Sequence, residues 1–226
     1  MGEMVHFPSN GGTTSGYLAL PQNRQGAGII VLQEWWGLVP HIKDIVDRFA
    51  AQGYVALAPD LYHGETATSP DRAGKLMMSL RIDEAEKELG GAVQYLLNHQ
   101  TVQPKKIGTV GFCMGGALSL YAASKNPQVN ACVVFYGGFP GIEPDIPNLK
   151  APVLGLYAAK DSFVTVDAVK QLEERLKAAG KTVDVHIYPN VDHGFFNDTR
   201  PEVYNQQAAN DAWQRVLNFY QQNLTA

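Results

Sequence analysis

A cysteine between two glycines is the feature of this 226-residue chain that most suggests chemistry. Cys113 is the central residue of GFCMG, residues 111–115, where a β-type run meets a helix-favouring run. A side chain on so tight a turn stands above the sheet, and its neighbours two residues away must lack bulk. The helix that begins there favours a thiolate through its dipole. The alternative is a buried structural cysteine, which is our prediction for Cys132 within the apolar run ACVVFY.

A histidine and an aspartate farther along the chain are suitable partners for this thiol. His193 follows the last expected strand, in DHGF, and could act as a general base toward Cys113. Asp161 follows the preceding strand and could orient the imidazole. The order nucleophile, acid, base resembles that of the α/β-hydrolases. Asp167 is the weaker candidate for the acid, because it lies inside or caps a helix.

The cluster QEWWG, residues 33–37, directly follows the apolar run GIIVL. In such folds this loop supplies the second oxyanion amide, so the N–H groups of Trp35 and Met114 are predicted to form an oxyanion hole. Adjacent residues cannot easily face the same interior, so one tryptophan, Trp36 in our assignment, is expected to line the pocket. The carboxylate of Glu34 needs a partner, because an unpaired buried charge is costly.

Apolar strands alternate with amphipathic helices along most of the chain, which is typical of an α/β fold. The strands expected after an opening hairpin are 28–32, 54–58, 107–112, 131–136, 153–158 and 183–188. The expected helices are 41–52, one or two within 72–98, 115–124, 166–179 and 202–223. We expect a single domain, residues 1–226, with a mostly parallel sheet of about seven or eight strands, helices on both faces and no large cap domain.

Composition excludes several classes of function. A formal net charge of −4 argues against binding to a phosphate backbone. No apolar run reaches about 18 residues, so we expect no membrane span. Two cysteines and a start without a secretory pattern predict a cytoplasmic protein. Metal-ligand spacings, a G-x-G-x-x-G motif and a P-loop are all missing from the sequence, so neither a metal nor another cofactor is expected.

With these motifs in place, the chain resembles the dienelactone hydrolase family of α/β-hydrolases. The matching pieces are Gln33-Glu34 with Gly37, residues 111–116, Asp161 and residues 192–195. The resemblance implies a triad of Cys113, His193 and Asp161. It also implies that Glu34 holds the thiol in the resting enzyme until substrate binding releases a thiolate. Family members that act on dienelactones bind the substrate carboxylate with arginines. Candidate substrate contacts here are Arg72, Arg81, Arg200, Trp36 and Phe195.

We therefore expect a hydrolase that cleaves a small lactone or carboxylic ester through a thioacyl-enzyme. Its partner would be the small-molecule substrate, and the protein would be a monomer or a small homo-oligomer. Three alternatives stay open: a general carboxylesterase or thioesterase with the same triad, a non-catalytic relative that binds a small ligand, and a redox-sensor thiol. The last lacks an evident resolving cysteine.

Overall fold

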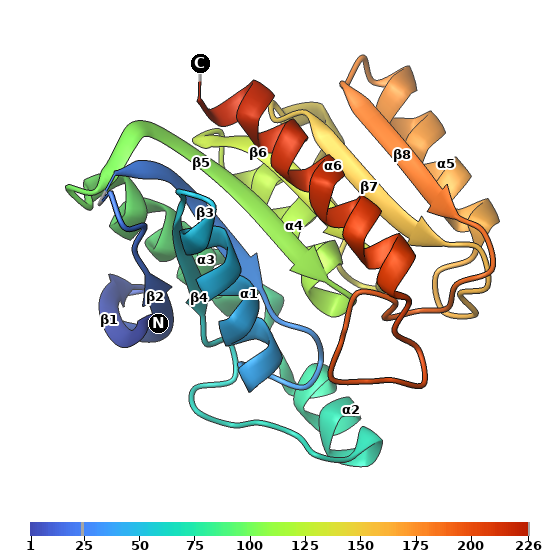
Figure 1. The fold of residues 1–226 in the computed structure, drawn as a ribbon, viewed down its shortest axis with the longest axis horizontal. Helices are drawn as coiled ribbons and strands as arrows, with labels where there is room; N and C mark the ends of the chain where they lie inside the picture. The colour runs from blue at the N-terminus through green and yellow to red at the C-terminus, as the bar shows by residue number, and fades with distance from the viewer. Residues whose placement is uncertain (24, 226) are drawn as a thin grey trace.

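The computed structural model describes residues 1–23 and 25–225, which form an eight-stranded sheet flanked by helices (Figure 1). The strand order is β1-β2-β4-β3-β5-β6-β7-β8. β1 and β2 form an antiparallel hairpin, β2 pairs antiparallel with β4, and the other neighbouring strands are parallel. The strands are β1 Glu3–Ser9, β2 Gly12–Ala19, β3 Gly26–Leu32, β4 Val55–Pro59, β5 Val102–Phe112, β6 Val129–Phe135, β7 Val153–Ala158 and β8 Val183–Tyr188. The predicted α/β-hydrolase architecture is confirmed.

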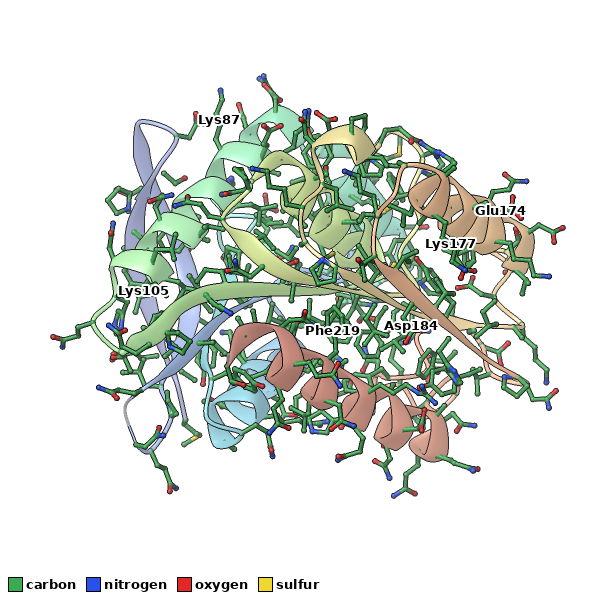
Figure 2. The ribbon with its side chains drawn as sticks, turned by 90° about the horizontal axis from the view of Figure 1, so that it is seen from above. Lys87, Lys105, Glu174, Lys177, Asp184 and Phe219 are labelled. Atoms are coloured by element: carbon green, nitrogen blue, oxygen red, sulfur yellow. The ribbon has the colours of Figure 1, made fainter. Side chains whose placement is uncertain are left out.

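Helices cover both faces of the sheet (Figure 2). They are α1 Pro40–Ala51, α2 Pro70–Ser79, α3 Ile82–Asn98, α4 Met114–Lys125, α5 Val166–Ala178 and α6 Gln206–Leu224, with a short 3-10 helix at Ile146–Asn148. Side chains of α1 and α6 join one apolar core, and those of α2, α3, α4 and α5 join the other. No helix in the described part of the chain is long and apolar enough to cross a membrane.

Of the one or two helices expected within 72–98, the structure shows two, and the terminal helix begins later than expected. The segment 72–98 is divided into α2 and α3, because Leu80 and Arg81 adopt extended backbone conformations between them. The terminal helix begins at Gln206, because the side chain of Asn205 accepts a hydrogen bond from the amide of Ala208 and caps the first turn.

The central strands explain where a site can form. β3 and β6 are almost entirely buried, as expected for parallel strands covered by helices on both faces. β5 lies between them, and its carboxyl end leads directly into α4. In open parallel sheets ligands bind at the carboxyl ends of the strands. Cys113 lies at this end of β5, and Gln33 follows β3 at the same edge.

Candidate active site

Cys113 lies on a strained turn between β5 and α4. Its backbone has φ 57° and ψ −120°, which side chains other than glycine rarely adopt. A Cβ atom on Gly111 would lie 1.8 Å from the carbonyl oxygen of Gly115, and one on Gly115 would lie 2.4 Å from the carbonyl oxygen of Gln33. Both flanking positions therefore require glycine, as the sequence predicted. The strain holds the sulfur at the N-terminus of α4.

His193 and Asp161 form a close pair beside the thiol. The Nδ1 atom of His193 lies 2.6 Å from the Oδ2 atom of Asp161, whose side chain is fully buried. The other carboxylate oxygen, Oδ1, accepts hydrogen bonds from the backbone amides of Phe163 and Val164, at 2.8 and 2.9 Å. The turn after β7 thus fixes the carboxylate, and the carboxylate fixes the ring.

The electrostatics of His193 indicate that it holds a proton strongly. Burial alone would lower the pKa of the imidazole, but hydrogen bonds to Asp161 and Cys113, with their negative charges, raise the pKa to about 10. Because Nδ1 faces Asp161, Nε2 is the ring nitrogen left for the sulfur. An imidazole in this position can take the thiol proton and stay paired with the resulting thiolate.

Two backbone amides near the sulfur are open to an acceptor. Trp35 follows the carboxyl end of β3, and Met114 is the first residue of α4. Among the hydrogen bonds of the described residues, neither amide acts as a donor. An amide at the first position of a helix has no intrahelical partner. Both groups are therefore available to an acceptor, and their role as an oxyanion hole stays a prediction.

Glu34 is buried and is held by residues from two distant loops. Its Oε2 atom accepts a hydrogen bond from Nδ2 of Asn197 at 2.7 Å, and its Oε1 atom lies 3.5 Å from the hydroxyl of Tyr136. The hydrogen bonds of the carboxylate thus go to Tyr136 and Asn197, not to the thiol. The ring of Tyr136 also lies against that of His193, with centroids 5.0 Å apart. Tyr136 therefore links the carboxylate to the triad.

A second polar group lies behind Glu34. His41 is buried, and its Nδ1 atom lies 3.2 Å from Asp198, which also forms an ion pair with Arg48. Burial is the largest effect on His41 and lowers its pKa, against the charges of Glu34 and Asp198. Its Nε2 atom is buried without a hydrogen-bond partner. Burial therefore favours the neutral form of the His41 ring.

Of the predicted substrate contacts, Trp36 and Arg200 meet each other. The guanidinium carbon of Arg200 lies 5.6 Å from the centroid of the Trp36 ring, and its Nη2 atom is paired with Glu202 at 2.8 Å. The backbone amide of Arg200 donates to the carbonyl oxygen of Asn197 at 3.1 Å, so Arg200 lies on the side of the site that holds Glu34. Phe195, in contrast, is fully buried and packs against Tyr136 and other aromatic rings of the core. Its position beside His193 serves packing.

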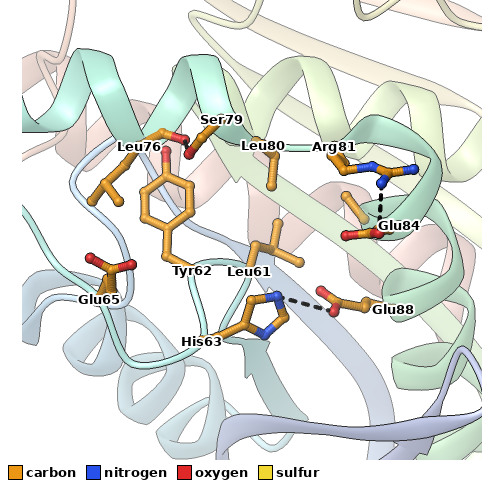
Figure 3. Close-up of a pocket in the computed structure, with 11 residues that line it drawn as sticks. Leu61, Tyr62, His63, Glu65, Leu76, Ser79, Leu80, Arg81, Glu84 and Glu88 are labelled. Atoms are coloured by element: carbon orange, nitrogen blue, oxygen red, sulfur yellow. Dashed lines mark hydrogen bonds and ion pairs between the residues drawn. The ribbon is translucent and has the colours of Figure 1, made fainter.

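Arg72 and Arg81 are engaged elsewhere. Arg72 is paired with Glu65, and Arg81 is paired with Asp83 and Glu84. Figure 3 shows Arg81 at the rim of a cavity of about 160 Å³, with its guanidinium turned toward Glu84. The structure therefore does not bring these two arginines to the triad.

Tyr62 is a site residue that sequence reasoning missed. Its hydroxyl donates to the sulfur of Met114 at 3.5 Å, and burial together with the charge of Cys113 raises its pKa. Thioether sulfur is a weak acceptor, so this phenol is a hydrogen-bond donor that is only weakly engaged, on the residue that follows the thiol. Tyr62, Tyr136 and Asn197 all come from connecting segments, and their spacing along the chain carries no signal that could have identified them.

Known proteins match this chain over nearly its full length. The model of the Dienelactone hydrolase family matches residues 14–224. "Protein usf" from Aquifex pyrophilus is 41% identical over 100% of both chains. "Putative carboxymethylenebutenolidase" from Aquifex aeolicus is 38% identical over 97% of this chain and 98% of the relative. The crystal structure of a "Putative Dienelactone Hydrolase" from Klebsiella pneumoniae has a TM-score of 0.90 and 32% identity, covering 98% of each chain.

The sheet order, the turn after β5 and the histidine after β8 together define an α/β-hydrolase fold. With the matches above, the chain belongs to the dienelactone hydrolase family and is a carboxylic ester hydrolase.

Proposed function

We propose that this protein hydrolyses a small lactone or carboxylic ester through a thioacyl-enzyme formed on Cys113. The observation that carries the proposal is the 2.6 Å contact between Nδ1 of His193 and the buried carboxylate of Asp161, at the edge of the sheet where Cys113 lies on its strained turn. A non-catalytic ligand-binding protein would have no need of a strained cysteine, a proton-holding imidazole and a fixed carboxylate in contact.

The steps follow from these positions. His193 takes the proton of the thiol, and the sulfur attacks the carbonyl carbon while the amides of Trp35 and Met114 receive the oxyanion. The carbonyl re-forms as the C–O bond of the ester breaks, and His193 gives its proton to the leaving oxygen. A water then loses a proton to His193 and attacks the thioester. The acid is released, and the proton returns to the sulfur.

Two observations bear on the kind of ester. The names of the relatives favour dienelactones, and Arg200 over Trp36 is the arginine best placed to meet a substrate carboxylate. The second candidate, a general carboxylesterase or thioesterase, is favoured by the neutral Asn197, which holds Glu34, and by the ion pairs that occupy Arg72 and Arg81. In either case a movement of Glu34 toward the thiol requires the hydrogen bond to Asn197 to break.

The test is hydrolysis of cis- and trans-dienelactone and of a neutral aryl ester by the wild type and Cys113→Ala, with Cys132→Ala as the matched control. Loss of a triad nucleophile costs several orders of magnitude in rate. We expect that loss for Cys113→Ala and near wild-type rates for Cys132→Ala. Turnover of dienelactones supports the lactonase, and turnover of the aryl ester alone supports the general esterase. Equal rates for Cys113→Ala and the wild type contradict the mechanism.

A further inference from the structure

A cavity of about 410 Å³ lies between α4 and α5, bordered by the loop of residues 137–144. Ala117 and Leu120 of α4, Val134 of β6, and Val164 and Leu172 on the α5 side form apolar walls. The volume falls in the range of about 300–1,000 Å³ that is usual for small-molecule sites. This space is large enough for a hydrocarbon group of several carbons.

The charged residues that border the cavity neutralise each other. Arg175 and Glu143 are both exposed, and their side chains approach to 3.5 Å. A substrate carboxylate would have to compete with Glu143 for this arginine. The cavity therefore suits an uncharged group.

The cavity adjoins the triad. Phe163 lines it, and the ring of Phe163 lies edge-on against that of His193, with centroids 5.4 Å apart. On the other wall, Gly116 and Ala117 belong to the same first turn of α4 that begins after Cys113. One helical turn rises about 5.4 Å. Gly116 and Ala117 therefore follow Cys113 within about one helical turn, and Phe163 joins the cavity to His193.

Phe163 itself indicates a ligand. Its side chain is 81% exposed, while most other aromatic rings near the triad are buried. An exposed phenylalanine gains stability when another apolar group covers it. Its place at the junction of cavity and triad makes a substrate hydrocarbon the group that would do so.

The loop backbone gives the cavity a fixed border. A Cβ atom on Gly137 would lie within 2.5–2.7 Å of the backbone of Gly116 and Ala117, so the loop packs directly on α4. A Cβ atom on Gly138 would lie 3.1 Å from the side chain of Val164. The two glycines allow a close approach, which leaves the cavity preformed.

We propose that this cavity, the α4–α5 cavity, binds an uncharged hydrocarbon group of the ester, so that the preferred substrates are esters of apolar acids or alcohols. The inference rests on the proposed function and adds the substrate class. The geometry favours an apolar group on either side of the ester bond, and the experiment distinguishes the two.

The experiment measures kcat/KM for two ester series, one lengthening the acyl chain with a constant alcohol and one lengthening the alcohol with a constant acetyl group. Each methylene that enters the cavity should raise kcat/KM by a factor of about four, until the cavity is full. We expect this rise in one of the series. A flat profile in both series would overturn the proposal.

Two tryptophan substitutions on α5 localise the effect. Ala168 is exposed and lines the cavity, so Ala168→Trp should fill it and lower the ratio of long-chain to short-chain kcat/KM by at least tenfold. Ala178→Trp, at an exposed position of the same helix outside the lining, should leave the ratio unchanged. Equal ratios in the wild type and both variants would contradict the assignment.

A binding measurement separates this proposal from the proposed function. Octanamide should bind to Cys113→Ala in a calorimetric titration, and adding Ala168→Trp should weaken binding at least tenfold. If no ester is hydrolysed but Ala168→Trp weakens octanamide binding, the result supports the binding site and contradicts the mechanism. If esters are hydrolysed without dependence on chain length and octanamide does not bind, the result supports the mechanism and contradicts the cavity assignment.

Discussion

Replacing Asp161 by asparagine tests how the triad is oriented. In the wild type one carboxylate oxygen accepts two amide hydrogen bonds, and the other accepts from Nδ1 of His193. The NH2 group of asparagine cannot accept a hydrogen bond, so the carbonyl oxygen must face the two amides. The NH2 group then faces Nδ1 and forces it to become the acceptor. The ring proton moves to Nε2, where it blocks uptake of the thiol proton.

The expected effect on rate is large. A reversed imidazole tautomer in serine-protease triads costs about 10⁴-fold in kcat, or roughly 5.5 kcal/mol of activation free energy. Stability should also respond. The folded-state pKa of His193 is about 10, above the ordinary 6.5, so protonation stabilises the wild type fully below about pH 6.5 and this contribution is lost as the pH rises toward 10. In Asp161→Asn the pKa falls, and this pH dependence shrinks.

The assay is kcat on an ester that the wild type hydrolyses, measured from pH 5 to 10, with 15N NMR of the imidazole to identify the tautomer. Asp192→Asn is the matched control, because Asp192 is exposed and adjacent to His193 in sequence. It removes the same charge without touching Nδ1. Wild-type rates for Asp161→Asn with the ring proton still on Nδ1 would refute the orienting role.

Three further predictions concern the turn at Cys113, the partner of Glu34 and the two thiols. Gly111→Ala should prevent the native turn, because its Cβ would lie 1.8 Å from the Gly115 carbonyl oxygen. Gly90→Ala, which has open space around it, should instead stabilise the protein by about 0.4–1 kcal/mol, and urea denaturation compares the two variants. Asn197→Ala removes the amide that donates to the buried Glu34 carboxylate and should lower the free energy of unfolding by about 1–3 kcal/mol in the same assay. An unchanged urea midpoint would show that this hydrogen bond does not stabilise the fold. Iodoacetamide should label one thiol in the folded wild type and none in Cys113→Ala, because burial raises the pKa of Cys132 to about 11; labelling of Cys132, read by mass spectrometry, would contradict this.

Local signals made the core of the site predictable from sequence. The turn at Cys113 can be recognised in the sequence by the glycines at positions 111 and 115, because the strained turn excludes every other side chain there. Asp161 and His193 follow apolar strands, and the end of a strand can be read from composition. Short-range backbone chemistry therefore placed all three residues at one edge of the sheet.

The remaining parts of the site depend on loop paths, which carry no periodic pattern. Asn197 reaches Glu34 across 163 residues of sequence, and Tyr136 does so across 102. The arginine candidates could not be ranked, because a guanidinium on a long side chain can turn to whichever carboxylate lies nearest. Arg72 is paired with Glu65 in the loop before α2, and Arg81 is paired with Asp83 and Glu84 of α3.

The position of β8 at the end of the sheet has a consequence for how the enzyme would lose activity. Cys113 follows β5, which has a paired strand on each side, whereas His193 follows β8, which lies at the end of the sheet beside β7 and is largely half-buried. Edge elements open locally at a lower free energy than central ones. Fraying of β8 would withdraw the imidazole while the rest of the molecule stayed folded. Inactivation should therefore precede global unfolding in denaturant, with faster amide exchange in β8 than in β5.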